Sequence, residues 1–381
     1  MASSTHTTTT KIPSAGQLKQ QPDGSDQSIL LKTIRDEAGE KVADYISEIL
    51  NLKAINNINT ILMPSALTLP SDAVIIDGVR AIVDLKLLNR TRYINKYIKG
   101  INQILPDGGL YVARFESQHQ REKRFFSHKC GFISKIEKFF DFWVHRVIPR
   151  LKYLNKIYFA ITKGKYRVLS LAEAMGRIAS CGFALIEHRQ IDGFTFAIAM
   201  KTRLPLTGFT PTFGPFVKLN RIGKNGKIIK VYKFRTMHPF SEFIQDYVVK
   251  MNGYNKAGKP ANDFRVTSWG KVFRKYWMDE FPQVLNVLKG QMRIVGVRPL
   301  SPTRFNELSE FLKTERVREK PGCIPPYVSL NMPSADTNVK AEVLYMWEKA
   351  IQDNRISRSA VNLRFFCSAV YNIITNRIVS A

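Results

Sequence analysis

The chain of 381 residues is long enough for two domains or one large one, and its composition, 44% hydrophobic, is ordinary for a globular protein. The 58 Lys and Arg residues outnumber the 31 Asp and Glu residues, giving a formal net charge of +27. This balance indicates anionic partners such as phosphorylated substrates, nucleic acid or an acidic membrane. The four cysteines lack metal-type spacing, which favours simple burial in a reduced compartment.

The first segment, residues 1–28, is rich in Thr, Ser, Gln, Gly and Pro without apolar periodicity, so we expect a disordered tail. It contains no apolar core of the length that a secretory signal requires. Further along, the most apolar stretch, residues 168–186, is interrupted by Glu173 and Arg177. We therefore expect no membrane-spanning helix.

Residues 29–205 have the pattern of an α/β module. The turn 106–109, Pro-Asp-Gly-Gly, stands between a helical pattern and an apolar run, and this order resembles the later half of nucleoside-dependent methyltransferase folds. The Gly-rich loop that brings the backbone close to a cofactor is missing, so we expect a degenerate Rossmann-like module without a cofactor, in which Asp77 and Asp84 are structural. Helices are predicted at 34–52, 87–105 and 171–180, and strands at 60–63, 73–76, 110–113, 183–187 and 194–200.

Within this module, residues 139–165 interleave aromatic and basic side chains. This mixture is typical of a membrane interface, and it also fits stacking on single-stranded nucleic acid. A third interpretation is an amphipathic segment packed between domains, with its cations in water. The side chains concerned are Phe139, Phe140, Phe142, Trp143, Tyr153, Tyr158 and Phe159 among Arg146, Arg150, Lys152, Lys156, Lys163 and Lys165.

The next stretch, residues 218–235, contains seven cations and no acidic residue, alternating with apolar side chains. Asn225-Gly226 is a hairpin signal, so two strands joined near 223–226 are predicted. Their side chains would present positive charge to anionic ligands or lipid headgroups, or form an ordinary solvated sheet face.

Asp279 and Glu280 are adjacent carboxylates that follow two cations and precede an apolar helical pattern ending at Gly290. The pair is therefore predicted at a helix N-terminus, where the backbone amides and the helix dipole favour anionic groups. Pro282 suits the first turn, which needs no amide donor there. The same position also fits a simple N-cap without chemistry.

The second half of the chain carries five distinctive blocks, GPFVKLNRIGKNGK (214–227), VYKFRTM (231–237), RKYWMDEFPQ (274–283), NVLKG (286–290) and VGVRP (295–299). Together they resemble the bacterial sugar transferases, the monotopic polyprenyl-phosphate hexose-1-phosphate transferases. Several separate blocks in one order are far more specific than a single motif. The resemblance implies a mixed α+β catalytic domain over residues 206–381, next to the α/β module.

The resemblance also implies an activity and its residues. A nucleotide-sugar, expected to be UDP-linked, would pass its sugar phosphate to a polyprenyl phosphate; Asp279 would attack the sugar-linked phosphorus and Glu280 would bind Mg²⁺. Such chemistry suits a weak carboxylate nucleophile assisted by a metal that needs only one or two carboxylates. Guanidinium and ammonium groups suit phosphate contacts. The residues expected to bind substrate are Arg221, Lys233, Arg235, Arg265, Arg274, Gln283 and Arg298.

The chain departs from the family at the membrane-attachment segment and at the acceptor end, and in single residues such as Phe264, Gln291, Arg293 and Val297. Typical members carry a long apolar, re-entrant membrane hairpin directly before the block that begins at Gly214, whereas residues 193–213 are too short and too interrupted. We therefore expect peripheral attachment to the anionic inner face of the cell membrane through Lys and Arg, weakening with salt. Residues 325–327, Pro-Pro-Tyr, stand where the family has Thr-Gly, at the acceptor end. A basic amphipathic helix is predicted at 361–379.

Three functions remain in view at this level. The leading one is a Mg²⁺-dependent enzyme of surface-polysaccharide or glycoconjugate synthesis. The first alternative is a catalytically silent scaffold, against which the intact run 279–283 argues. The second is a basic nucleic-acid-binding protein, but no nucleic-acid motif supports it, so we expect no such partner.

Overall fold

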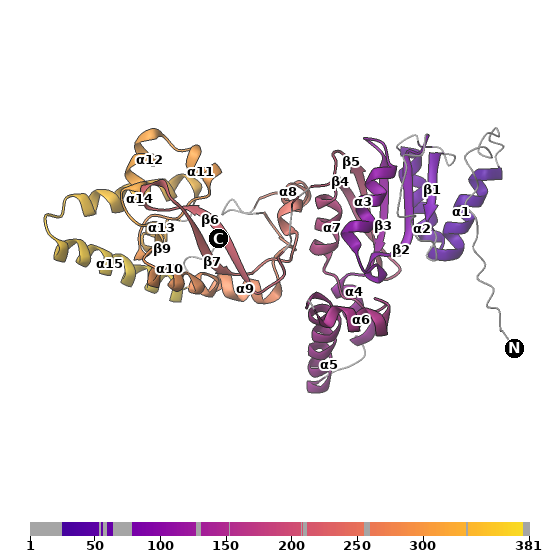
Figure 1. The fold of residues 1–381 in the computed structure, drawn as a ribbon, viewed down its shortest axis with the longest axis horizontal. Helices are drawn as coiled ribbons and strands as arrows, with labels where there is room; N and C mark the ends of the chain where they lie inside the picture. The colour runs from indigo at the N-terminus through magenta and orange to yellow at the C-terminus, as the bar shows by residue number, and fades with distance from the viewer. Residues whose placement is uncertain are drawn as a thin grey trace.

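The computed structural model describes residues 25–52, 55, 59–63, 78–126, 131–151, 153–206, 208, 212–254, 260–332 and 334–375. The strand predicted at 73–76 and Asp77 lie outside these ranges. Of the tail predicted at 1–28, only residues 25–28 are described, and there the prediction is wrong because they form the first turn of helix α1 (Ser25–Ala38). Figure 1 shows a sheet-containing N-terminal part joined to a C-terminal part with a long two-stranded hairpin.

The N-terminal part is built on a five-stranded sheet of order β1-β2-β3-β5-β4. The first three strands run parallel, while β5 pairs antiparallel with both β3 and β4. The strands predicted at 183–187 and 194–200 and the strand after the Gly-Gly turn are confirmed. The bounds are β1 (Thr60–Met63), β2 (Ala81–Leu87), β3 (Leu110–Phe115), β4 (Phe183–Ile191) and β5 (Phe194–Lys201).

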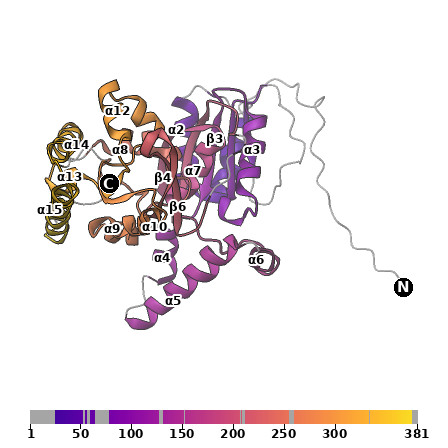
Figure 2. The same cartoon turned by 60° about the vertical axis from the view of Figure 1, so that its left-hand side comes forward.

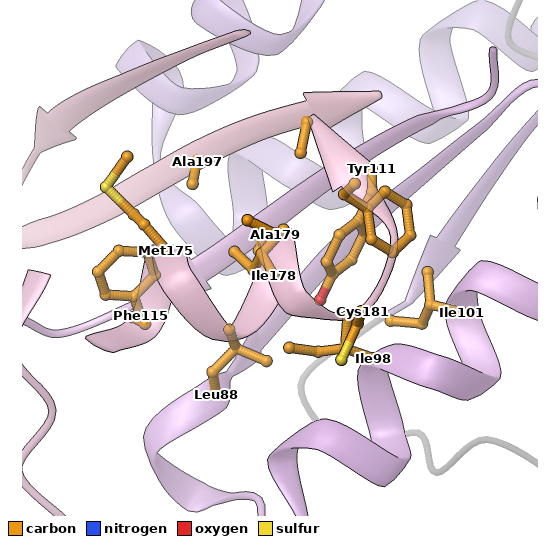
Figure 3. Packing of buried hydrophobic residues seen from close by; sticks show 14 of the residues in the cluster. Leu88, Ile98, Ile101, Tyr111, Phe115, Met175, Ile178, Ala179, Cys181 and Ala197 are labelled. Carbon is orange, nitrogen blue, oxygen red and sulfur yellow. The ribbon is translucent and has the colours of Figure 1, made fainter. Parts of the chain in front are cut away.

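Helices cover both faces of this sheet (Figure 1). Side chains of β2 alternate between the two cores: Val83 packs with α1 and α2, and Ile82 packs with α3 and α7. Figure 3 shows the second core, in which Tyr111 of β3 lies among residues of α3 and α7. The bounds of these helices are α2 (Glu40–Leu52), the 3-10 helix η2 (Leu88–Arg90), α3 (Ile94–Ile104), α4 (Gln118–Phe126) and α7 (Leu171–Ser180).

Two helix predictions need correction. The helix predicted at 34–52 is broken at Gly39, whose φ of 94° lies in the left-handed region that favours glycine. The helix predicted at 87–105 begins only at Ile94, because Leu87 ends β2, an unpredicted strand, and residues 88–90 form η2. Its buried Asp84 accepts hydrogen bonds from two tyrosine hydroxyls, in agreement with a structural role.

A helical projection leaves the N-terminal part between α4 and α7 (Figures 1 and 2). It consists of α5 (Phe132–Phe142), a π-helical turn η3 (Trp143–Val147), a 3-10 turn η4 (Ile148–Arg150) and α6 (Leu154–Thr162). Many aromatic and aliphatic side chains of α5 and α6 are exposed, whereas Arg146 of η3 is buried and contacts His238. Packing between the two parts of the chain therefore accounts for η3 but not for the exposed faces of α5 and α6.

The C-terminal part is organised around the predicted hairpin of β6 (Phe216–Ile222) and β7 (Ile228–Phe234), whose turn places Asn225 at a φ of 56°. A second pair, β8 (Arg293–Val295) and β9 (Gly322–Ile324), is parallel. The helices are η6 (Ser241–Ile244), α8 (Gln245–Asn252), α9 (Ser268–Lys275), η7 (Met278–Gln283), α10 (Val284–Leu288), α11 (Pro302–Asn306), α12 (Glu310–Val317), α13 (Pro326–Ser329), α14 (Ala335–Ala350) and α15 (Arg355–Ile374). The C-terminal helix predicted at 361–379 is confirmed in α15 as far as Ile374, and residues 376–379 lie outside the described ranges.

The chain crosses back to the N-terminal part after the hairpin. Ile244, Tyr247 and Val248 of η6 and α8 join the core around α7, although they follow the boundary predicted at 205. A Cβ on Gly176 of α7 would lie 2.2 Å from the carbonyl oxygen of Phe240, so a glycine permits this close approach. The two parts therefore share a packed contact.

Candidate active site

Asp279 and Glu280 lie in the first turn of the 3-10 helix η7, which runs directly into α10. The predicted helix start is thus confirmed, with a tighter helix than expected. Trp277 immediately before it has a φ of 58°, a left-handed conformation that turns the chain from α9 into η7, and its carbonyl accepts from the Glu280 amide at 3.1 Å. The indole of Trp277 is buried against Tyr327 and fixes this turn.

The contacts of Asn286 explain why an asparagine stands at the start of the NVLKG block. Its side chain is fully buried, and its Nδ2 donates to the Lys230 carbonyl at 2.8 Å and to Gln291 Oε1 at 2.9 Å. Its Oδ1 accepts from the Tyr232 amide at 3.1 Å. One side chain therefore ties α10 to β7, and with α10 it holds the carboxylates beside the hairpin.

We expect Asn286→Ala to lower the free energy of unfolding by about 2–4 kcal/mol, because it leaves two backbone groups of β7 and the Gln291 amide without this partner. Asn286→Asp should be partly tolerated, since it keeps the acceptor and loses the donor. Urea unfolding of both variants tests this, with the exposed Asn220→Ala on β6 as the control. An unchanged midpoint for Asn286→Ala would contradict the anchoring role.

A cleft of about 450 Å³ opens beside η7. Its lining carries a net positive charge: Arg221 of β6, Lys233 of β7 and Arg298, Arg304 and Arg316 from the later segments all reach it. The other lining residues are Val231, Glu280, Gln283, Pro299, Leu300, Ser301, Glu307, Leu308, Cys323, Pro325, Tyr327, Asn338, Val339 and Glu342. The three lining carboxylates, Glu280, Glu307 and Glu342, pair with Lys233, Arg304 and Arg316, so the cations of the lining exceed its carboxylates by two. This excess suits an anionic ligand.

Glu280 is the member of the carboxylate pair that lines this cleft. It forms an ion pair with Lys233 and accepts a hydrogen bond from the side chain of Gln283. Asp279 is only 3% exposed and is not among the lining residues. It lies close enough to Arg274 to act on that guanidinium: burial lowers the pKa of Arg274, and the Asp279 carboxylate partly offsets this.

Arg298 and Tyr327 line the cleft together. The guanidinium lies 5.8 Å from the centre of the tyrosine ring, and the Arg298 amide donates to Glu342 at 3.0 Å. Burial lowers the pKa of Arg221, and the charge of Arg298 lowers it further, so the two guanidinium groups share one electrostatic environment. An anionic ligand between them would relieve this repulsion.

The structure gathers four of the seven predicted binding residues, Arg221, Lys233, Gln283 and Arg298, at the cleft, and places three elsewhere. Arg235 donates to the Gly214 carbonyl at 2.9 Å. Arg265 is buried in a bidentate pair with Asp263 at 2.8 Å. Arg274 donates to Thr236 at 3.0 Å. In this structure these three hold the backbone and loops around the site.

Arg304, Arg316 and Glu342 also line the cleft and were not predicted, while Tyr327 belongs to the run 325–327 expected at the acceptor end. Ser301 caps α11 by accepting from the Arg304 amide at 3.3 Å, so the Ser-Pro start of that helix was a readable signal for the position of Arg304. Arg316 and Glu342 form a buried ion pair between α12 and α14. No local pattern reveals that pair, because its partners are distant in sequence.

The cleft offers few protein ligands for Mg²⁺, and a Mg²⁺ site needs few. Over the ranges that the structure describes, no group of three His, Cys, Asp or Glu side chains is arranged to hold a metal. Mg²⁺ commonly keeps several waters and binds one or two carboxylates together with phosphate oxygens. Glu280, which faces the cleft with Asp279 as its neighbour, is compatible with that donor set.

Comparison with known proteins agrees with this geometry. Residues 194–357 match the family model of the bacterial sugar transferases. The chain is 37% identical over 136 residues to the galactosyl transferase CpsE of Streptococcus agalactiae, covering 35% of this chain and 30% of that protein. It is 34% identical to the exopolysaccharide production protein ExoY of Rhizobium meliloti over 31% of this chain and 54% of ExoY. It is 39% identical to the undecaprenyl-phosphate galactose phosphotransferase of Salmonella typhimurium, over 21% and 18%.

Residues 194–357, which contain the basic cleft and the carboxylate pair, match the bacterial sugar transferase family. The match spans from under a fifth to about half of the length of these relatives. The matched segment begins at β5, inside the N-terminal sheet, and ends in α15.

Proposed function

We propose that this protein is a phosphoglycosyl transferase that moves a sugar 1-phosphate from a nucleotide-sugar, of the UDP class, to a polyprenyl phosphate. The observation that carries the proposal is the basic cleft around Glu280, whose cations suit the diphosphate of such a donor. Relatives named as undecaprenyl-phosphate sugar phosphotransferases support the same acceptor. The product would begin a surface polysaccharide or glycoconjugate on the inner face of the cell membrane.

The reaction proceeds in two displacements. An Asp279 carboxylate oxygen attacks the sugar-linked phosphorus, and the bond from that phosphorus to the bridging oxygen breaks, releasing the nucleoside monophosphate. A phosphate oxygen of the lipid then attacks the same phosphorus and releases the carboxylate. Because Asp279 is buried here, donor binding has to bring its carboxylate to the cleft.

Lys233 would change its ionic partner when the donor binds. Its ammonium group pairs with Glu280 in this structure and lies at the cleft, so the incoming diphosphate can compete for it. Transfer of Lys233 to the phosphate would leave the Glu280 carboxylate for Mg²⁺, which when bound withdraws charge from the phosphoryl group. Arg221 and Arg298 would hold the remaining phosphate oxygens in line.

The direct test incubates purified protein with a panel of UDP-sugars, Mg²⁺ and undecaprenyl phosphate, and follows UMP release. One UDP-sugar should give acceptor-dependent UMP together with a lipid-linked sugar diphosphate. Arg298→Ala should reduce this release strongly, whereas Arg235→Ala, outside the cleft, should retain more activity. Absence of UMP release with every donor tested, in detergent and on vesicles, would favour the silent scaffold.

Glu280→Gln should weaken activity mainly through metal affinity, because it removes a charged ligand from a site with few carboxylates. We expect the Mg²⁺ concentration for half-maximal rate to rise by about tenfold or more, with partial rescue by excess Mg²⁺. A Mg²⁺ titration of the UMP-release rate measures this. An unchanged Mg²⁺ dependence with a lower maximal rate would instead assign Glu280 a role in positioning.

A further inference from the structure

The α5–α6 projection, residues 132–162, exposes an unusual amount of apolar surface. Phe132 and Ile133 are 76% and 72% exposed, and Ile161 at the other end is 78% exposed. Contiguous apolar patches of this kind on a soluble surface mark a binding face. The exposed apolar side chains of the projection are Phe132, Ile133, Ile136, Phe139, Phe140, Trp143, Val144, Leu151, Tyr153, Leu154, Ile157 and Ile161.

These side chains form one ordered face of the helix. Residues 132, 136, 140 and 143 recur at helical spacing along α5 and η3. On another side of α5, Asp141 makes a bidentate ion pair with Arg121 of α4, with one contact of 2.6 Å, and Ser134 is buried. The projection is therefore anchored to the body, and its apolar face is held outward.

The apolar surface continues onto the transferase domain. The rings of Phe142 in α5 and Trp269 in α9 lie edge to face with centroids 6.2 Å apart. From there α9, η7 and α10 expose Trp269, Val272, Tyr276, Met278, Phe281, Val284, Leu285 and Leu288. In Figures 1 and 2, α5 extends from the lower side of the molecule, on which α9 and α10 also lie. We call this surface, from α5–α6 through α9 to α10, the apolar strip.

The charges of the projection indicate what covers the strip. Over residues 131–151 and 153–166, every exposed charged side chain is a lysine: Lys135, Lys138, Lys156, Lys163 and Lys165. A face of aromatic and aliphatic side chains rimmed by lysines matches an anionic bilayer, in which the apolar groups enter the acyl region and the cations meet the headgroups.

The dimensions favour insertion without crossing. Residues 132–147 of α5 and η3 span about 24 Å at the usual helical rise, less than the roughly 30 Å of a bilayer core. Within the described part of the chain no helix is long and apolar enough to cross a membrane.

We propose that the apolar strip inserts into an anionic lipid bilayer, so that the N-terminal module supplies a membrane anchor and retention is hydrophobic and resistant to salt. The role of this anchor rests on the proposed function. Insertion would place η7, which carries Glu280 and the exposed Phe281, at the lipid surface where a polyprenyl phosphate resides.

The test uses the full chain and vesicles of phosphatidylcholine with about one third phosphatidylglycerol, without polyprenyl lipid, washed in about 1 M NaCl to screen surface charge. The wild type should stay with the vesicles. Phe132→Ser with Phe140→Ser should reduce the partition coefficient by about tenfold or more. The control, Leu204→Ser with Phe311→Ser, removes two side chains of similar exposure outside the strip and should bind like the wild type.

Two further measurements separate the outcomes. Sedimentation without lipid should show the same mass for the wild type and the Phe132/Phe140 variant; a wild-type dimer that this variant dissolves would overturn the proposal in favour of a protein interface. Complete release of the wild type by salt, or unchanged binding by the variant, would also overturn it.

UMP release with detergent-dispersed acceptor should survive in the variant. Its absence even in the wild type would count against the transferase proposal alone, since vesicle binding is measured without substrate.

Discussion

Asp279→Asn is expected to lower acceptor-dependent UMP release by at least about 10³-fold, because an amide cannot form the acyl phosphate through which the sugar phosphate would pass. With donor alone, the wild type should release UMP in a burst and gain the mass of one sugar phosphate. The variant should show neither, while its thermal unfolding midpoint stays close to that of the wild type. The exposed Asp246→Asn on α8 is the matched control.

Peptide mapping of the trapped protein makes the test sharper. Asp279 is buried, whereas Glu280 lines the cleft. Mapping therefore determines which of the two carboxylates carries the sugar phosphate. An adduct on Asp279 requires the movement on donor binding that we propose. An adduct on Glu280, or wild-type UMP release by folded Asp279→Asn, would remove Asp279 from the nucleophile role.

Glu173→Gln is expected to lower the free energy of unfolding by about 3–5 kcal/mol, because it leaves buried guanidinium groups without their counter-charge. Glu173 is fully buried in α7 and pairs with Arg150, with Arg177 at 2.9 Å and with Arg146 at 3.4 Å. The matched control is Glu187→Gln, which removes an exposed pair with Arg189 and should change stability by about 1 kcal/mol or less. Urea unfolding compares the two, and equal effects would contradict the buried-network account.

The same cluster predicts a pH dependence. Burial alone would raise the pKa of Glu173, but the surrounding guanidinium groups outweigh it and hold that pKa well below its usual value of 4.5. A lowered folded-state pKa stabilises the fold above the unfolded-state pKa, and this contribution is lost as the pH falls through the folded-state value. The wild type should therefore lose more stability than Glu173→Gln on acidification below about pH 4.5.

The cluster also lies where the two parts of the chain meet. Arg146 contacts the imidazole of His238 at 3.2 Å, and Arg177 stacks on Phe240 at 4.5 Å. Burial, reinforced by the charge of Arg146, lowers the pKa of His238 to about 3, so this imidazole is neutral at physiological pH. Loss of Glu173 would loosen the contact between the sheet and the segment that follows the β6–β7 hairpin.

The sequence by itself determined the features that depend on local pattern. Alternating apolar residues around Asn225-Gly226 predicted the β6–β7 hairpin, and a carboxylate pair before Pro282 predicted the helix start at η7. The helix 171–180 and the strand 60–63 were predicted with the bounds that the structure shows. In each case the signal lies within a few residues, where turn chemistry and helical spacing act.

Only the tertiary structure decided which charged groups share the cleft. Arg265 and Arg298 both looked like phosphate ligands in the sequence, but a carboxylate two residues away engages Arg265, whereas Arg298 faces the cleft. Arg316 and Glu342 lie in the cleft wall because α12 packs near α14, and neither local sequence predicts that the two residues pair. The exposure of α5 likewise depends on what covers a helix in space, because an apolar face reads the same in the sequence whether it packs in a core or faces solvent.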